Sequence, residues 1–164
     1  MANNPSEFKG ANNPVENVSW DDCQTFLKKL NALPTVKKTH LAFRLPKDDE
    51  WENACRSGSN GTYCKLEDGT DITEENLGSI AWVEDNSNKM THPVGEKHPN
   101  AFGLHDMLGN VWEWTQTANS GNDHVICGGS WNSTSKGAVA SYRISFPPSI
   151  RLSNVGFRLI AEKR

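Results

Sequence analysis

The chain has 164 residues, a net charge of −3 and 23% charged residues, and no basic stripe stands out. These values predict one globular domain spanning 1–164. They argue against a nucleic-acid partner, which calls for a basic stripe, and no apolar run approaches the ~18 residues of a membrane span. Six Trp, 13 Gly and 8 Pro predict a loop-rich domain with a core of large aromatic side chains.

The first part of the chain predicts a lead-in and a helix. Residues 1–13 are polar and rich in Asn and Pro, which is typical of an extended segment. Ser19 and Asp22 have the spacing of a capping box, the pattern that begins a helix. Pro34 is expected to end this helix because its ring cannot continue the helical backbone.

The rest of the chain predicts short elements separated by turns. Residues 40–46 favour a strand, and residues 47–58 favour a second helix because their first turn is acidic and Gly58 follows their end. Residues 57–80 are rich in Gly, Asn and acidic residues and predict a long loop. In Val155, Phe157 and Leu159, apolar residues alternate as in a closing strand. Short strands are expected within 79–84, 92–97, 100–117, 123–131 and 154–162.

The four cysteines, Cys23, Cys55, Cys64 and Cys127, lack the CxxC spacing of a zinc site. Cys55 and Cys64 are near enough in sequence to bridge a short loop. Buried free thiols are an equally good interpretation, and the sequence does not decide between the two.

Three residue types stand out as structural. Certain glycines occupy positions where a Cβ would block a turn or a close backbone approach: Gly103, Gly109, Gly128 and Gly129. Five tryptophans can fill a core that few helices supply: Trp20, Trp51, Trp112, Trp114 and Trp131. Four arginines are expected to act as partly buried hydrogen-bonding forks: Arg44, Arg143, Arg151 and Arg158.

Five blocks of sequence occur in a fixed order: NPVENVSWDDCQTF, FRLPKDDEWENACRSG, HPVGEKHPNAFGLHDMLGNVWEW, GGSW and NVGFR. In this order and spacing they resemble the formylglycine-generating-enzyme (sulfatase-modifying factor) family, over residues 13–160. The resemblance implies an α+β fold of the C-type lectin type, loop-rich, with two short helices and short antiparallel strands.

The resemblance also bears on catalysis. Enzymes of this family oxidise a substrate cysteine with a cysteine pair placed just after the GGSW block, whereas no cysteine follows Cys127 here. Ser and Thr cannot replace a thiolate as a redox nucleophile or copper ligand. The sequence therefore predicts no enzyme, no catalytic residues and no catalytic cofactor. Nor do the histidines have the i,i+4 spacing of a helical metal site: His40, His92, His98, His105 and His124.

The stretch DMLGNVWE places two carboxylates, Asp106 and Glu113, around a tight turn. Hard cations such as calcium prefer oxygen ligands of this kind. The resemblance implies a structural Ca²⁺ held by these two side chains and by the backbone carbonyls of Gly109 and Val111. The alternative is that both carboxylates accept hydrogen bonds from N–H groups of the loop.

Between Gly128 and Leu159, frame residues alternate with a series that has no period. This layout resembles the variable proteins that retroelements diversify, especially the Treponema variable protein A type. There, adenine-directed mutation randomises Asn codons, and an AAC codon changed at both adenines cannot encode Lys, Gln, Glu, Met or Trp. None of these occurs at the thirteen interleaved positions: Asn132, Ser133, Thr134, Gly137, Tyr142, Ile144, Ser145, Phe146, Pro147, Ser149, Ile150, Leu152 and Ser153.

Residues 128–159 are therefore expected to form a variable ligand-binding region on a rigid scaffold, as antibody loops do. Exposed together, Ile144, Phe146 and Ile150 would form an apolar patch of the kind that marks binding sites. We expect Phe146, Ile150 and Tyr142 to act as the main anchors. The sequence thus predicts a receptor-like or adhesin-like protein whose ligand is a protein or a cell-surface molecule.

The resemblance to variable proteins implies a monomeric surface lipoprotein whose leader, with its lipid-anchor signal, has been removed. Nothing in the residues encodes an address. Two alternatives remain open: an enzyme of the formylglycine-generating and sulfur-oxidising superfamily, and a structural subunit with a fixed partner.

Overall fold

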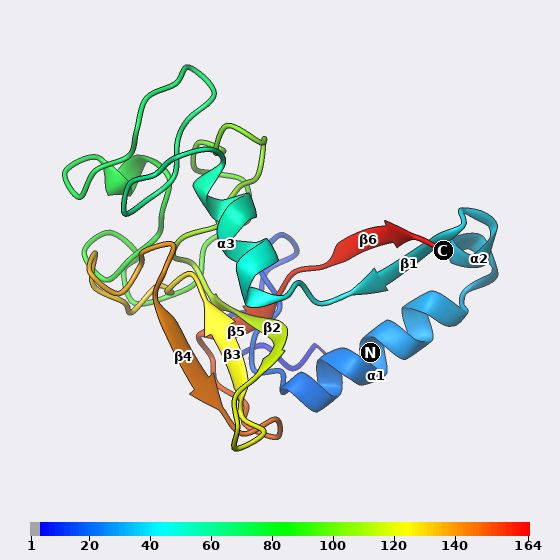
Figure 1. The fold of residues 1–164 in the computed structure, drawn as a ribbon. Helices are drawn as coiled ribbons and strands as arrows, with labels where there is room; N and C mark the ends of the chain where they lie inside the picture. Colours follow the sequence, from blue (N-terminus) through cyan, green and yellow to red (C-terminus); the bar gives the residue numbers. More distant parts are fainter. Residues whose placement is uncertain (1–3) are drawn as a thin grey trace.

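A four-stranded sheet lies at the centre of the fold (Figure 1). The structure is a computed structural model that describes residues 4–164. The strands stand in the order β4-β3-β2-β5. The pairs β2–β3 and β3–β4 are antiparallel, as predicted for the short strands of this fold, whereas β5 runs parallel to β2. The bounds are Trp112–Ala118 for β2, His124–Cys127 for β3, Arg143–Phe146 for β4 and Val155–Phe157 for β5.

The first helix, α1, spans Trp20–Ala32, and its start is the predicted capping box. The Ser19 hydroxyl accepts from the Asp22 N–H, and the Asp22 carboxylate accepts from the Ser19 N–H, at 3.1 and 2.9 Å. The helix ends at Ala32 as expected, but Pro34 also begins a second short helix, α2 (Pro34–Lys38). Proline suits that position because the first helical residue needs no N–H partner.

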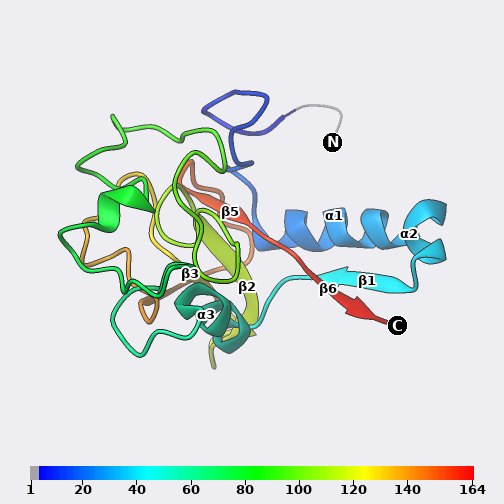
Figure 2. The same cartoon turned by 90° about the horizontal axis from the view of Figure 1, so that it is seen from above.

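A second, two-stranded sheet pairs β1 (Leu41–Arg44) with β6 (Ile160–Lys163). Together with α1 and α2 it extends from the main body, as Figure 2 shows from above. The predicted closing strand at 154–162 is therefore two strands in two sheets. The break falls at Arg158 and Leu159, where the Arg158 guanidinium turns toward Glu113.

Helix α3 (Asp48–Arg56) confirms the second predicted helix, and the segment that follows it is a loop as expected. No strand forms in 79–84 or 92–97: Leu77–Ser79 is a 3-10 helix, and Trp82 makes only an isolated bridge to Gly109. The Asn86 side chain explains the first difference, since it accepts from the Val83 N–H and donates to the Ala81 carbonyl. These backbone groups are therefore not free to form hydrogen bonds with a neighbouring strand.

The structure also differs from the prediction in residues 100–117, in the lead-in and in strand β4. Of residues 100–117 only the last part is a strand, and the earlier part forms turns. Residues 1–3 of the predicted lead-in lie outside the described residues. The rest is not extended: the Asn13 N–H closes a turn on the Gly10 carbonyl at 3.3 Å. Strand β4 was not predicted, because prolines follow it directly and hide its short alternation.

The core has two clusters of buried side chains, one around Trp51 and one around Trp112 and Trp114. These three tryptophans confirm the prediction of an aromatic core, whereas Trp20 and Trp131 are half-buried. All four cysteines are buried free thiols. No helix within residues 4–164 is long and apolar enough to cross a membrane.

Candidate ligand-binding surface and cation site

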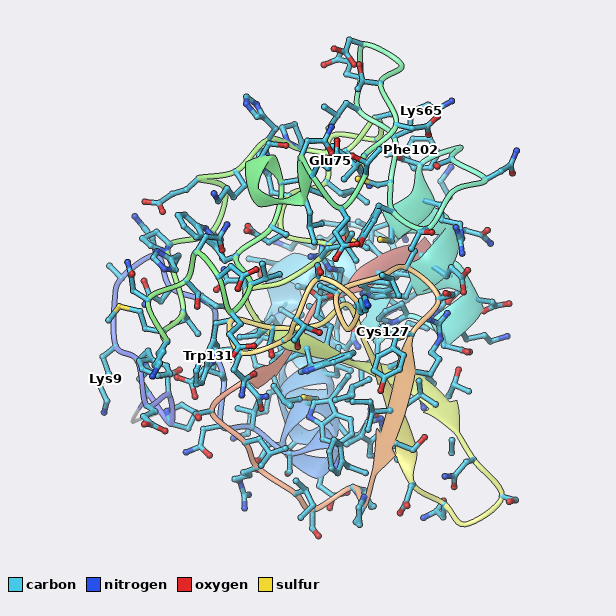
Figure 3. The ribbon with its side chains drawn as sticks, turned by 90° about the vertical axis from the view of Figure 1, so that its left-hand side faces the viewer. Lys9, Lys65, Glu75, Phe102, Cys127 and Trp131 are labelled. Carbon is cyan, nitrogen blue, oxygen red and sulfur yellow. The ribbon has the colours of Figure 1, made fainter. Side chains whose placement is uncertain are left out.

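The variable segment begins at two glycines whose backbone only glycine adopts easily. Gly128 and Gly129 have φ values of 102° and 78°, in the left-handed region. A Cβ on Gly129 would lie 2.8 Å from the Cα of Ala138, and one on Gly128 would lie 2.9 Å from the Met107 carbonyl oxygen. The glycines thus fix the entry of the segment, which starts between Cys127 and Trp131, both labelled in Figure 3.

The arginines of the segment donate to carboxylates in other elements, as the prediction of hydrogen-bonding forks requires. Arg143 and Arg158 are partly buried as expected, whereas Arg151 is exposed, so the prediction of partial burial is wrong for Arg151. The Arg143 guanidinium lies 2.5 Å from the Glu52 carboxylate and 3.4 Å from that of Asp48, both on α3. It also donates to the Asp48 and Ala140 carbonyls. Arg143 therefore ties the start of β4 to the N-terminal half of α3.

Arg151 connects the segment to α1 through a similar ion pair. Its guanidinium donates twice to the Asp22 carboxylate, at 2.7 and 2.9 Å, and Asp22 also completes the capping box of that helix with Ser19. The Arg151 hydrogen bonds lower the pKa of Asp22 to about 2. The partners of these arginines were not foreseen because they lie 91 to 129 residues away along the chain.

None of the thirteen variable positions is fully buried. This is the distribution expected of side chains that can change without disturbing a core. Eight of the thirteen are half-buried. The five exposed ones are Asn132, Thr134, Tyr142, Pro147 and Ser149.

The apolar patch expected from Ile144, Phe146 and Ile150 is not exposed as predicted. All three are half-buried, and Ile144 and Phe146 pack on the core cluster around Trp114. Their strand pairing with β3 places Ile144 opposite the buried Ile126, so they face partly inward. Of the three expected anchors, Tyr142 is the exposed one, at 46%.

Two of the variable positions also take part in the frame. The Asn132 side-chain oxygen Oδ1 accepts from the Ser130 hydroxyl at 2.7 Å and from the Asn154 side-chain amide at 2.9 Å. The Ser133 hydroxyl accepts from the Ser130 N–H at 3.0 Å. Replacement of either side chain therefore costs hydrogen bonds within the turn, unlike replacement at Thr134 or Ser149.

Asp106 and Glu113 line one cavity of about 360 Å³, as the sequence predicts for a cation site, and Val111 and Arg158 line it as well. One Asp106 oxygen accepts from the Gly95 N–H at 2.8 Å, but the other is buried without a partner. Burial raises the pKa of Asp106.

Glu113 is held by two donors. Arg158 donates to both its oxygens, at 2.5 and 2.7 Å, and the Trp51 indole N–H donates to one of them at 2.6 Å. The oxygen that accepts from Arg158 alone keeps a free lone pair. The two carboxylates outnumber the one guanidinium, so a cation would balance the charge here.

Three of the four expected ligands, Asp106, Val111 and Glu113, line this cavity, whereas Gly109 does not. A calcium ion here would be held by the Asp106 oxygen without a partner, the less occupied Glu113 oxygen and the Val111 carbonyl, because calcium is bound by carboxylate and carbonyl oxygens. When bound, the ion would cross-link the turn to the start of β2.

Comparison with known protein families and sequences relates this chain to the formylglycine-generating enzymes. A family model described as "Sulfatase-modifying factor enzyme 1-like domain" matches residues 2–163. The chain is 29% identical to the chaperone protein LppX of Paenibacillus barcinonensis, over 99% of this chain and 75% of that protein. It is 30% identical to the inactive C-alpha-formylglycine-generating enzyme 2 of Bos taurus, over 88% of this chain and 49% of the relative. It is 31% identical to the formylglycine-generating enzyme of Mus musculus, over 93% and 45%. The chain spans about half the length of the last two relatives.

Two solved structures have the same fold as this chain. Treponema denticola variable protein 1 superposes with a TM-score of 0.82 at 29% identity, over all of this chain and 79% of that one. PvdO from Pseudomonas aeruginosa superposes with a TM-score of 0.78 at 26% identity, over 96% and 64%. Both resemblances read from the sequence, to the enzyme family and to the variable proteins, are confirmed. The chain belongs to the family of sulfatase-modifying factor enzyme 1-like domains, with the α+β fold of the formylglycine-generating enzymes.

Proposed function

We propose that this protein is a non-catalytic binding protein that presents changeable side chains from residues 132–153 on a fixed frame. The observation that carries the proposal is that the segment contains two kinds of residue, accessible changeable positions and arginines held by ion pairs. Every changeable position is at least partly accessible, whereas Arg143 and Arg151 are bound to carboxylates of α3 and α1. The structural likeness to a treponemal variable protein supports it.

The state of the cysteines supports the absence of the formylglycine reaction. No cysteine follows Cys127, and burial raises the pKa of Cys127 and of Cys23 to about 12. Thiols that stay protonated at neutral pH are poor nucleophiles and poor metal ligands. The family also contains a relative named inactive, so loss of the enzymatic chemistry has a precedent within it.

By likeness to the variable proteins, the protein would be a monomer held at the cell surface by a lipid anchor. Its ligand would be a protein or another cell-surface molecule.

The proposal is tested by sequencing this gene in many cells and isolates of its source. Substitutions should concentrate at the thirteen variable codons, and codons 143, 151 and 158 should stay constant. Because Ile144 and Phe146 pack on the core, copies that still fold should keep apolar residues there more often than at Tyr142 or Ser149. Substitutions spread evenly along the gene would contradict the proposal and favour an enzyme or a fixed-partner subunit.

We also propose that Asp106 and Glu113 bind a structural calcium ion. Thermal melts in calcium and in EDTA should then differ, with a higher Tm in calcium, because a ligand that binds only the folded state stabilises it. Asp106→Asn should remove the difference, and Asp68→Asn, an exposed loop carboxylate, should not. Equal melts of the unaltered protein in calcium and EDTA would exclude a structural ion.

A further inference from the structure

The order of the central sheet leaves β4 and β5 at its two edges, and the two edges differ. The edge at β5 is closed by the chain before α1: a Cβ on Gly156 would overlap the Val15 carbonyl oxygen, and the Asn17 N–H donates to the Leu152 carbonyl at 3.0 Å. No further strand can add beside β5 without displacing this segment.

The edge at β4 is open. Within residues 4–164, the backbone of Arg143–Phe146 forms hydrogen bonds with β3 and with no other backbone segment. In an antiparallel pair, the N–H and C=O groups of every second residue point away from the partner strand. Figure 1 shows β4 at the outside of the sheet. This edge therefore offers unpaired donors and acceptors in the middle of the variable segment.

The chain around this edge contains few unpaired charges. From Gly128 to Leu159 there is no Asp or Glu. Of the four basic residues there, Arg143, Arg151 and Arg158 are paired with carboxylates and Lys136 is exposed. Proteins commonly protect an open edge with charged side chains or prolines. Here the protection consists of the short length of β4 and the prolines after it, Pro147 and Pro148, which leaves the strand itself accessible to an uncharged partner.

We propose that β4 is the docking edge for an extended, uncharged peptide segment of the protein ligand, which adds to the sheet as a further strand. This inference rests on the proposed binding function and names its partner. Main-chain hydrogen bonds would supply affinity that does not depend on the variable side chains, and those side chains would supply specificity. The site would thus bind its partners through the same main-chain hydrogen bonds even when its variable side chains differ.

The probe is a disulfide-closed β-hairpin peptide whose outer strand reads Thr-Val-Thr-Val, titrated into the ¹⁵N-labelled protein. The amide signals of residues 143–146 should shift saturably, and those of β2 should not. A matched probe with two outward N–H groups methylated should bind about thirtyfold more weakly, because it loses two hydrogen bonds of about 1 kcal/mol each.

Equal binding of the two probes, or no shift at millimolar peptide, would overturn the inference. Concentration-dependent shifts of the same signals without peptide would overturn it too, since they would show β4 pairing with a second copy. Two independent experiments separate this inference from the proposed function. If the protein prefers the unmethylated probe while sequencing finds no focus of substitutions, the docking edge stands and the diversified function fails.

Discussion

Replacing Gly109 with alanine is expected to destabilise the protein by about 2–4 kcal/mol. The residue has a φ of 74°, and a Cβ there would overlap the Trp82 carbonyl oxygen and lie 2.8 Å from the Trp82 backbone nitrogen. The left-handed backbone costs an alanine about 1 kcal/mol, and forced overlap in a packed interior adds about 1–3 kcal/mol. Far-UV circular dichroism with urea titration measures the loss.

Gly103→Ala is the matched control for this change. Gly103 has the same φ of 74°, but a Cβ there would meet nothing within 4 Å. It should therefore lose only the backbone contribution of about 1 kcal/mol. Equal losses in the two variants would show that the close approach of Trp82 to Gly109 contributes nothing.

Replacing Arg158 with methionine is expected to destabilise the protein by about 3 kcal/mol. The Glu113 side chain is 7% exposed, and removal of one partner leaves a buried charge without compensation. The guanidinium also donates to the carbonyls of His105 and Asp106, which would lose their donor. Urea unfolding followed by tryptophan fluorescence would report the change, since Trp51 donates to the same carboxylate.

Two comparisons give this result its meaning. Arg44→Met breaks a more accessible pair, with Glu50 at 35% and Glu162 at 49% exposed, and should cost about 1 kcal/mol or less. The double variant Glu113→Gln with Arg158→Met should lose less than the sum of the single losses, because neither charge is then left alone. Additive losses would mean that the two side chains act independently.

Local signals made part of this fold predictable. The capping box at Ser19 and Asp22 needs residues three apart, so the sequence shows it directly. The acidic first turn of α3 and the left-handed glycines are local in the same way. The strand β4 was missed because four residues next to two prolines carry little pattern, and its place beside β3 is decided by tertiary contacts.

In the candidate sites, too, features set by local sequence were predictable and features set by tertiary contacts were not. Asp106 and Glu113 were found because they flank one turn, and the structure places them on one cavity. The inward orientation of Ile144 and Phe146 could not be predicted, because it depends on which face of an unforeseen strand meets Ile126. For the same reason the arginines were identified as forks without their partners, which lie in α1, α3 and β2.

The three arginine–carboxylate pairs have a consequence for how such a segment can evolve. Arg143, Arg151 and Arg158 each reach a carboxylate in a different element of the fold. An inserted or deleted residue between two of them would move one guanidinium away from its partner, whereas a substitution elsewhere in the segment would not. Under the proposed function, exchange between gene copies should therefore transfer the segment as a cassette of constant length, in which residues change but the spacing of the arginines is preserved.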